Sequence, residues 1–173
     1  FADYQSGTLD AVAYNEFVCQ FFVNKTTAEL NALHDRFMQT VIRPAMRPLG
    51  IAAIEKHRQA GHEVVIITAT NRFVTAPIAH AFGVKHLIAS NPEIINGEYT
   101  GKLDGEPCFQ IGKLHHLEAW LATHKKPAQS LESWGYSDSF NDLPLLNFAD
   151  HAIVVTPDKR LHAHALDHHW AVE

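Results

Sequence analysis

The run Val64-Val65-Ile66-Ile67 constrains the fold of this chain more than any other stretch. Four consecutive β-branched residues are typical of a strand in a parallel sheet that is covered by helices on both faces. From residue 50 onward, strand patterns alternate with helix patterns, and further strands are expected at residues 85–89, 133–136 and 152–155. This alternation predicts an α/β fold, with a parallel sheet, right-handed crossovers and helices on both faces.

Residues 1–48 contain helical patterns and no strand pattern. The apolar residues of 17–22 recur at helical spacing, which favours a helix packed into the core. Thr26 and Glu29 have the spacing of a capping box, so a second helix is expected to begin there.

Composition places the chain among ordinary globular proteins, since 46% of its 173 residues are apolar and 19% are charged. This length suits one domain, or one domain with a small insertion. The net charge of −5 gives no reason to expect nucleic acid or an anionic membrane as a partner. No apolar run approaches the roughly 20 residues that cross a bilayer, and no signal peptide is evident, so the cytoplasm is the expected location.

The cysteines do not indicate a disulfide framework, and the histidines cluster late in the chain. Cys19 and Cys108 are far apart and form no CxxC pattern, which favours two free thiols in a reducing compartment. Four of the thirteen histidines lie near the C-terminus: His162, His164, His168 and His169. They could contribute to a zinc site, but no cysteine or carboxylate pattern completes a ligand set, so a solvated terminal helix is favoured.

The segment Ser133–Leu146 predicts a short strand, a turn and then a helix with Pro144 in its first turn. The turn holds Asp138, Asn141 and Asp142, and either of the last two can supply the N-cap oxygen of the helix. Carboxylates at the carboxyl end of a strand lie where ligands bind in open α/β sheets, and their oxygens suit Mg²⁺. The alternative is a capped turn without chemistry.

Two more polar residues are expected at the same edge of the sheet. Thr68 follows the buried strand and precedes a helix, so its hydroxyl and the next amide groups are placed to hold an anion. Lys113 lies at the start of an amphipathic helix, where burial would require an anionic partner. Together with Asp138 and Asp142, these residues are the parts that phosphoryl transfer requires. Each also has a plain alternative, namely a helix cap, a solvated lysine and a capped turn.

Taken in order, these three stretches resemble motifs two, three and four of the haloacid dehalogenase-like (HAD) superfamily: Val-Val-Ile-Ile-Thr68, Gly112-Lys113 and Tyr-Ser-Asp138-Ser-Phe-Asn141-Asp142. The closest branch includes phosphoserine phosphatase. The resemblance covers nearly the whole chain and implies a Rossmann-like core at residues 49–173 and a small helical cap domain at residues 1–48. It also implies a Mg²⁺-dependent phosphatase that acts on a small phosphorylated metabolite through a phospho-aspartate.

The resemblance implies roles for the residues expected around the phosphate. Thr68 would bind the phosphate through its hydroxyl, with help from the amide of Ala69. Lys113 would neutralise the phosphate and the developing aspartyl-phosphate. Asn71 and Arg72 lie close enough to the crevice to contact substrate, although surface solvation explains Arg72 equally well.

The resemblance likewise implies roles for the residues expected around the metal. Asp138 would ligate Mg²⁺. Asn141 and Asp142 would orient metal-bound water and Lys113 without touching the metal. Asp158, which follows the last predicted strand, agrees with the same family pattern.

One motif of the family does not occur in this sequence. HAD phosphatases carry a nucleophilic aspartate, followed two residues later by an acid/base aspartate, on a strand that precedes the cap domain. Asp3 and Asp10 cannot replace them, because neither follows an apolar run. The sequence is therefore expected to be an N-terminally truncated record of a complete phosphatase, to lack one strand, and to be inactive by itself.

Two other functions remain open. One is a phosphate-binding or regulatory module that keeps the fold without catalysis. The other is a receiver-like signalling domain, which also places carboxylates, a threonine and a lysine around Mg²⁺. The helices before residue 48 and the hairpin predicted at Asn96-Gly97 argue against a receiver.

The substrate is only partly constrained. Phosphoserine phosphatases carry a cap-domain arginine that grips the substrate carboxylate, whereas residues 17–22 here are apolar. Phosphoserine is therefore disfavoured, and another small phosphomonoester, such as an amino-alcohol phosphate of the histidinol phosphate kind, remains open. The oligomeric state is not indicated by the sequence.

Overall fold

The computed structural model describes residues 8–127 and 130–173, which fall into two compact units. One unit spans Asp10–Pro107, and the other contains Cys108–Glu173. The predicted division at residue 48 into a cap domain and a core stays a prediction.

The first half of the Asp10–Pro107 unit is helical, as expected. Its elements are α2 (Ala11–Cys19), η1 (Gln20–Phe22), α3 (Thr27–Phe37), the π-helical η2 (Met38–Ile42), α4 (Arg43–Ala45) and α5 (Pro48–Gln59). The predicted capping box is confirmed, because the Glu29 amide donates to Thr26 Oγ1 at 3.2 Å and the Thr26 amide donates to Glu29 Oε2 at 2.8 Å. The Thr26 amide and the Thr26 hydroxyl, which donates to the same Oε2 at 2.8 Å, lower the pKa of the Glu29 carboxyl.

The apolar stripe of residues 17–22 is only partly buried. Phe22 lies in a core cluster with Cys19 and Leu30, but Phe17 and Phe21 are 66% and 61% exposed and pack edge to face on each other. The interpretation of the stripe as core is therefore wrong for these two residues. Helical spacing identifies an apolar face, but it does not show which part of that face another element will cover.

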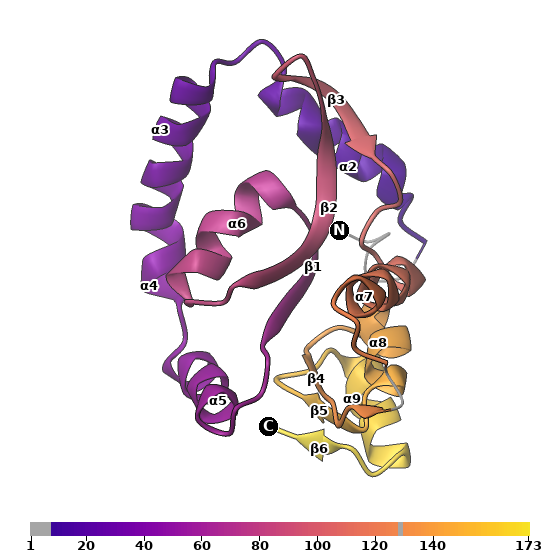
Figure 1. Cartoon of the computed structure of the whole chain (residues 1–173). Coiled ribbons are helices and arrows are strands. Elements are labelled where there is room, and N and C mark those ends of the chain that lie inside the picture. Colours follow the sequence, from indigo (N-terminus) through magenta and orange to yellow (C-terminus); the bar gives the residue numbers. More distant parts are fainter. Residues whose placement is uncertain (1–7, 128–129) are drawn as a thin grey trace. The chain divides into compact units, whose positions relative to one another are not determined.

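The second half of this unit holds strands β1 (Val65–Asn71), β2 (His86–Ile95) and β3 (Glu98–Asp104), with helix α6 (Arg72–Ala81) between β1 and β2. Strand β2 pairs in parallel with β1 and antiparallel with β3 (Figure 1). The strand expected at residues 85–89 is the first part of β2, which begins at His86 and continues to Ile95. The hairpin at Asn96-Gly97 is confirmed, with φ of 55° and 85° as a type I′ turn requires.

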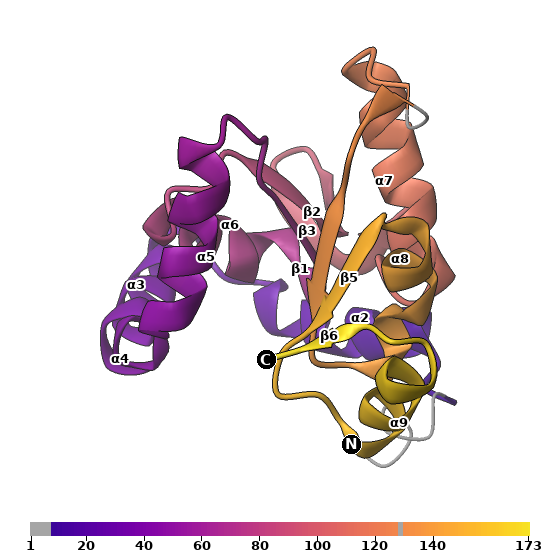
Figure 2. The ribbon, with the colours of Figure 1, turned by 90° about the horizontal axis from the view of Figure 1, so that it is seen from below.

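The second unit contains a fully parallel sheet with β5 in the middle. Its elements are α7 (Ile111–Thr123), β4 (Trp134–Ser137), η4 (Phe140–Asp142), α8 (Leu143–Phe148), β5 (His151–Val154), α9 (Lys159–Asp167) and β6 (Ala171–Val172). Ser137, the last residue of β4, pairs with Val154, so the turn that begins at Asp138 lies at the carboxyl end of this sheet. Figure 2 shows β5 and β6 side by side. Leu146, Val154 and Leu161 form the centre of the core.

The α/β class with parallel strands is confirmed, although the described strands form two three-stranded sheets. Cys19 and Cys108 are both buried free thiols, as predicted. None of the helices described for residues 8–127 and 130–173 is long and apolar enough to cross a membrane.

Candidate active site

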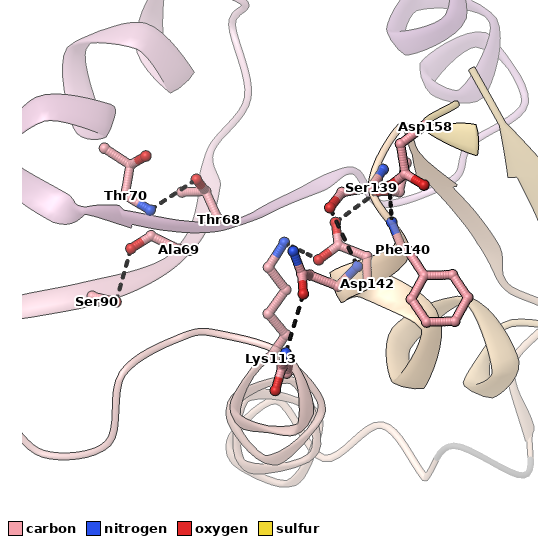
Figure 3. A network of polar contacts seen from close by, with 12 residues as sticks. Thr68, Ala69, Thr70, Ser90, Lys113, Ser139, Phe140, Asp142 and Asp158 are labelled. Carbon is pink, nitrogen blue, oxygen red and sulfur yellow. Dashed lines mark hydrogen bonds and ion pairs between the residues drawn. The ribbon is translucent and has the colours of Figure 1, made fainter. Parts of the chain in front are cut away.

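Strand β1 is irregular where the phosphate-binding residues were predicted. Its pairing with β2 is regular up to Thr68, and the register then shifts before Asn71. In this bulge, Thr68 Oγ1 accepts a hydrogen bond from the Thr70 amide at 3.2 Å, and the Ala69 carbonyl accepts one from Ser90 Oγ at 3.0 Å (Figure 3). The hydroxyl proton of Thr68 is not used in its bond to Thr70, so this half-buried side chain can still donate to an anion.

Asn71 has a structural role that its sequence did not reveal. It is 2% exposed, and its Oδ1 caps α6 by accepting from the Val74 amide at 3.1 Å. A substrate contact through the remaining amide group stays a prediction. Arg72 is exposed and held in place, since it donates to Asn91 Oδ1 at 2.8 Å and to the Leu87 carbonyl at 2.9 Å.

Arg72 also lines a cavity of about 620 Å³ within the Asp10–Pro107 unit. Its walls come from α3, α6, β2 and β3, and include His34, Phe73 and Tyr99. His34 Nε2 lies 2.8 Å from the Val74 carbonyl, which can only accept, so this nitrogen carries the proton. The cavity places an aromatic wall next to the Arg72 guanidinium.

In the other unit, Lys113 forms a buried ion pair with Asp142. The distance from Nζ to Oδ1 is 2.5 Å, and the two side chains are only 9% and 13% exposed (Figure 3). Lys113 lies in the first turn of α7, and its amide donates to the carbonyl of Gln110, which precedes the helix, at 3.1 Å. Because an ammonium group is costly to bury alone, the anionic partner expected from the sequence is present.

Asp142 does not serve as a helix cap. It occupies the N-cap position of α8, but its side chain makes no capping hydrogen bond. Its Oδ1 contacts Lys113, and its Oδ2 accepts from Ser137 Oγ at 2.7 Å. The prediction that Asn141 or Asp142 supplies the cap oxygen is wrong, because these contacts occupy both Asp142 oxygens and Ser139 caps η4 instead. The capped-turn alternative therefore fails for Asp142.

Asp138 is the exposed carboxylate of this turn. Its backbone carbonyl accepts from the Asp158 amide at 2.8 Å, and within the described residues its carboxylate has no hydrogen-bond or ion-pair partner. An exposed carboxylate at a strand end fits Mg²⁺, which commonly takes one or two protein carboxylates and completes its coordination with water and phosphate. Residues 8–127 and 130–173 contain no group of three or more His, Cys, Asp or Glu side chains that could hold a metal. A metal at Asp138 would therefore need water and phosphate oxygens as further ligands.

Asn141 is 8% exposed, and its Oδ1 accepts from Gln110 Nε2 at 3.1 Å. Gln110 directly precedes α7 and has a φ of 47°, which is uncommon for a residue other than glycine. Sequence reasoning missed this residue, because nothing in its neighbours signals the conformation. Through Gln110 and Lys113, the start of α7 contacts the turn between β4 and α8 at two adjacent residues.

The late histidines provide no zinc site among the residues described. His164 and His168 lie one turn apart on the same side of α9, and their rings stack with centroids 3.8 Å apart. His168 Nδ1 lies 2.9 Å from the His164 carbonyl, so this nitrogen is directed to the backbone.

Replacement of Ser137 by alanine is expected to lower the free energy of unfolding by about 1.5–3 kcal/mol, the usual contribution of a hydrogen bond to a charged group. The change leaves Asp142 Oδ2 without its donor, and it also removes the acceptor of the Ser139 amide at 3.1 Å. Urea denaturation would measure the effect. Ser130→Ala is the control, because that exposed hydroxyl bonds only to a nearby carbonyl in its own turn. Equal values for the two variants would contradict the buried network.

The predicted site residues thus fall into two groups. Thr68 and Ala69 lie within β1, at its register shift and not after the strand as expected, in one unit; Lys113, Asp138 and Asp142 lie in the other. The structure brings Lys113 and Asp142 together. The convergence of the two groups on one phosphate stays a prediction.

The fold and these groups define the class of protein: it is an α/β protein with a threonine at the register shift of one parallel strand. After another parallel strand, a turn with two carboxylates is linked to a buried lysine. A family model of haloacid dehalogenase-like hydrolases matches residues 2–147. The chain belongs to this family.

Among its relatives is a histidinol-phosphatase of Neisseria meningitidis, 35% identical over 174 residues that cover 99% of this chain and 78% of the relative. A phosphoserine phosphatase of Mycobacterium tuberculosis is 29% identical over 94% of this chain and 52% of the relative. The chain thus spans only about half the length of its mycobacterial relatives.

Solved structures agree with the fold. A Bordetella pertussis Tohama I protein of unknown function has a TM-score of 0.94 and 40% identity, covering 99% of this chain and 77% of the other. A phosphoserine phosphatase with bound substrate has a TM-score of 0.66 and 14% identity, covering 94% of this chain and 73% of the other, and this likeness concerns the fold alone.

Proposed function

We propose that the full-length protein is a Mg²⁺-dependent phosphomonoester hydrolase that acts on a small phosphorylated metabolite. The observation that carries this proposal is the buried Lys113–Asp142 ion pair at the turn that exposes Asp138. A purely structural turn has no need to bury an ammonium group and to leave a carboxylate four residues away without a partner. Membership of the HAD-like hydrolase family supports the same reaction class.

In the proposed reaction, Thr68 Oγ1 and the Ala69 amide bind phosphate oxygens, and Lys113 neutralises their charge. Asp138 would hold Mg²⁺, which supplies charge stabilisation at the phosphate when bound. Asp142 keeps the Lys113 ammonium in place through the observed ion pair. Asn141 would position water near the metal.

The nucleophile in this proposal is an aspartate on a strand that is not among residues 1–173. Its carboxylate oxygen forms a bond to phosphorus while the bond from phosphorus to the leaving alcohol oxygen breaks, and a second aspartate protonates that oxygen. Water then hydrolyses the phospho-aspartate and releases inorganic phosphate. We expect residues 1–173 by themselves to be inactive, because neither Asp3 nor Asp10 follows an apolar strand as this nucleophile requires.

We also propose that residues 1–48 belong to a cap domain and residues 49–173 to the catalytic core. The helices α2 and α3 in the first segment and the parallel strands in the second support this division. The two free thiols support a location in the reducing cytoplasm.

For the substrate, we favour an amino-alcohol phosphate of the histidinol phosphate kind over phosphoserine. Residues 17–22 offer no cation for a substrate carboxylate, and Phe17 and Phe21 expose aromatic rings there. The Neisseria meningitidis relative named histidinol-phosphatase supports the same choice.

The test is hydrolysis by the full-length protein of histidinol phosphate, phosphoserine and p-nitrophenyl phosphate, with Mg²⁺ and with EDTA. We expect kcat/KM for histidinol phosphate to exceed that for phosphoserine by about tenfold or more, and EDTA to stop the reaction. The reverse preference would refute the substrate proposal alone. Binding of phosphate without turnover of any ester would favour the regulatory alternative and refute the enzyme.

A further inference from the structure

Asp158 connects the N-terminus of α9 to the turn that carries Asp138. Its Oδ1 accepts from the Arg160 and Leu161 amides, both at 2.9 Å, and so caps α9. Its Oδ2 accepts from the Phe140 amide at 2.6 Å (Figure 3). Its own amide donates to the Asp138 carbonyl at 2.8 Å. One residue therefore binds the backbone on both sides of Ser139.

This double attachment exceeds what capping a helix requires. A single oxygen is sufficient for an N-cap, as Asp10 shows at α2, where one oxygen accepts from the Ala13 amide at 2.9 Å. At Asp158 the second oxygen is directed to the Phe140 amide instead. The Phe140 ring is held as well, since the Arg160 guanidinium lies 4.0 Å from its centroid.

The direction of the Asp138 carboxylate depends on this backbone. Within the described residues, no side chain or backbone group binds that carboxylate. The turn therefore sets where the Cα–Cβ bond of Asp138 points, and Asp158 fixes the Asp138 carbonyl and the Phe140 amide on the two sides of Ser139. Some groups orient a metal ligand without touching the metal themselves. Their removal commonly lowers metal affinity 10- to 100-fold.

We propose that Asp158 is a positioning residue for the Asp138 carboxylate. It holds the turn between β4 and η4 in the conformation that presents this oxygen ligand to Mg²⁺. The inference rests on the proposed function, because it takes Asp138 as the metal ligand.

The variant Asp158→Ser separates the capping of α9 from the hydrogen bond to the Phe140 amide. Serine caps a helix about as well as aspartate does, but its single oxygen cannot also reach the Phe140 amide. Asp158→Asn is the second variant, because it keeps the size of the side chain and the cap oxygen while placing an amide donor toward the Phe140 N–H. Asp10→Ser is the matched control, since it makes the same change at the N-cap of α2.

The readout is Mn²⁺ binding to the full-length protein without substrate, followed by electron paramagnetic resonance, with thermal melting as the measure of folding. We expect Asp158→Ser and Asp158→Asn to melt close to the wild type and to bind Mn²⁺ about tenfold or more weakly. Asp10→Ser should bind Mn²⁺ as the wild type does. Wild-type affinity in either folded Asp158 variant would overturn the proposal.

Two further measurements separate the possible failures. If Asp138→Asn also leaves Mn²⁺ binding unchanged, the metal assignment of the proposed function falls, and the inference falls with it. If both Asp158 variants fail to fold, the wild-type protein decides through hydrogen exchange at the Phe140 amide. Strong protection is expected from the 2.6 Å bond, and free exchange would overturn the proposal.

Discussion

Replacement of Lys113 by methionine is expected to lower the free energy of unfolding by about 3–5 kcal/mol, the usual cost of removing one partner of a buried ion pair. Methionine fills a similar volume but leaves the Asp142 carboxylate, which is 13% exposed, without its counter-ion. In the full-length protein we also expect kcat/KM to fall by about 10²–10³-fold, because the ammonium no longer neutralises the phosphate. Urea denaturation and p-nitrophenyl phosphate hydrolysis measure the two effects.

The double variant Lys113→Met/Asp142→Leu separates stability from catalysis. Replacing a buried ion pair with apolar side chains is often neutral, so most of the lost stability should return. Activity and the binding of phosphate-mimicking anions should stay low. Lys102→Met, at an exposed position on β3, is the control and should change neither property. A double variant with wild-type activity would disprove the proposed role of Lys113.

Replacement of Asp138 by asparagine is expected to leave stability almost unchanged, unlike Lys113→Met, and to lower activity strongly. The stability of the protein should change by less than about 0.5 kcal/mol, since the carboxylate is exposed and has no partner among the described residues. Mg²⁺-dependent hydrolysis by the full-length protein should fall by about 10³-fold, corresponding to several kcal/mol of lost charge stabilisation. A Mg²⁺ titration of the rate, together with thermal melting, tests both expectations.

Asp167→Asn provides the control for this change, because it removes another exposed carboxylate at the end of α9. Its rate and Mg²⁺ dependence should equal those of the wild type. Full activity of Asp138→Asn would refute the metal assignment, whereas a large loss of stability would show that Asp138 has a partner outside residues 8–127 and 130–173.

The features that the sequence predicted correctly are local ones. The capping box of Thr26 and Glu29 and the hairpin at Asn96-Gly97 form as expected, because each depends on residues no more than three positions apart. The need for an anion near Lys113 was also predictable, since it follows from the cost of burying an ammonium group.

The errors concern contacts between distant segments. The apolar residues of 17–22 correctly indicated a helix. Which part of its apolar face is buried depends on the elements that pack against it, and Phe17 and Phe21 are exposed. Asp142 has the sequence context of a helix cap, yet Lys113, 29 positions earlier, and Ser137 occupy its oxygens. An ion pair with a buried ammonium outweighs an exposed cap, which contributes about 1 kcal/mol.

By itself, the sequence determined the α/β class, the alternation of strands and helices after residue 50 and the residue types available for phosphate chemistry, because periodicity and turn chemistry act over a few residues. Only the tertiary structure decided that both Asp142 oxygens bind Lys113 and Ser137 instead of capping a helix, and that Asp158 binds the backbone on both sides of Ser139. Such pairings join residues far apart in the chain. They depend on which polar groups the folded core brings together, because buried polar groups must bind one another.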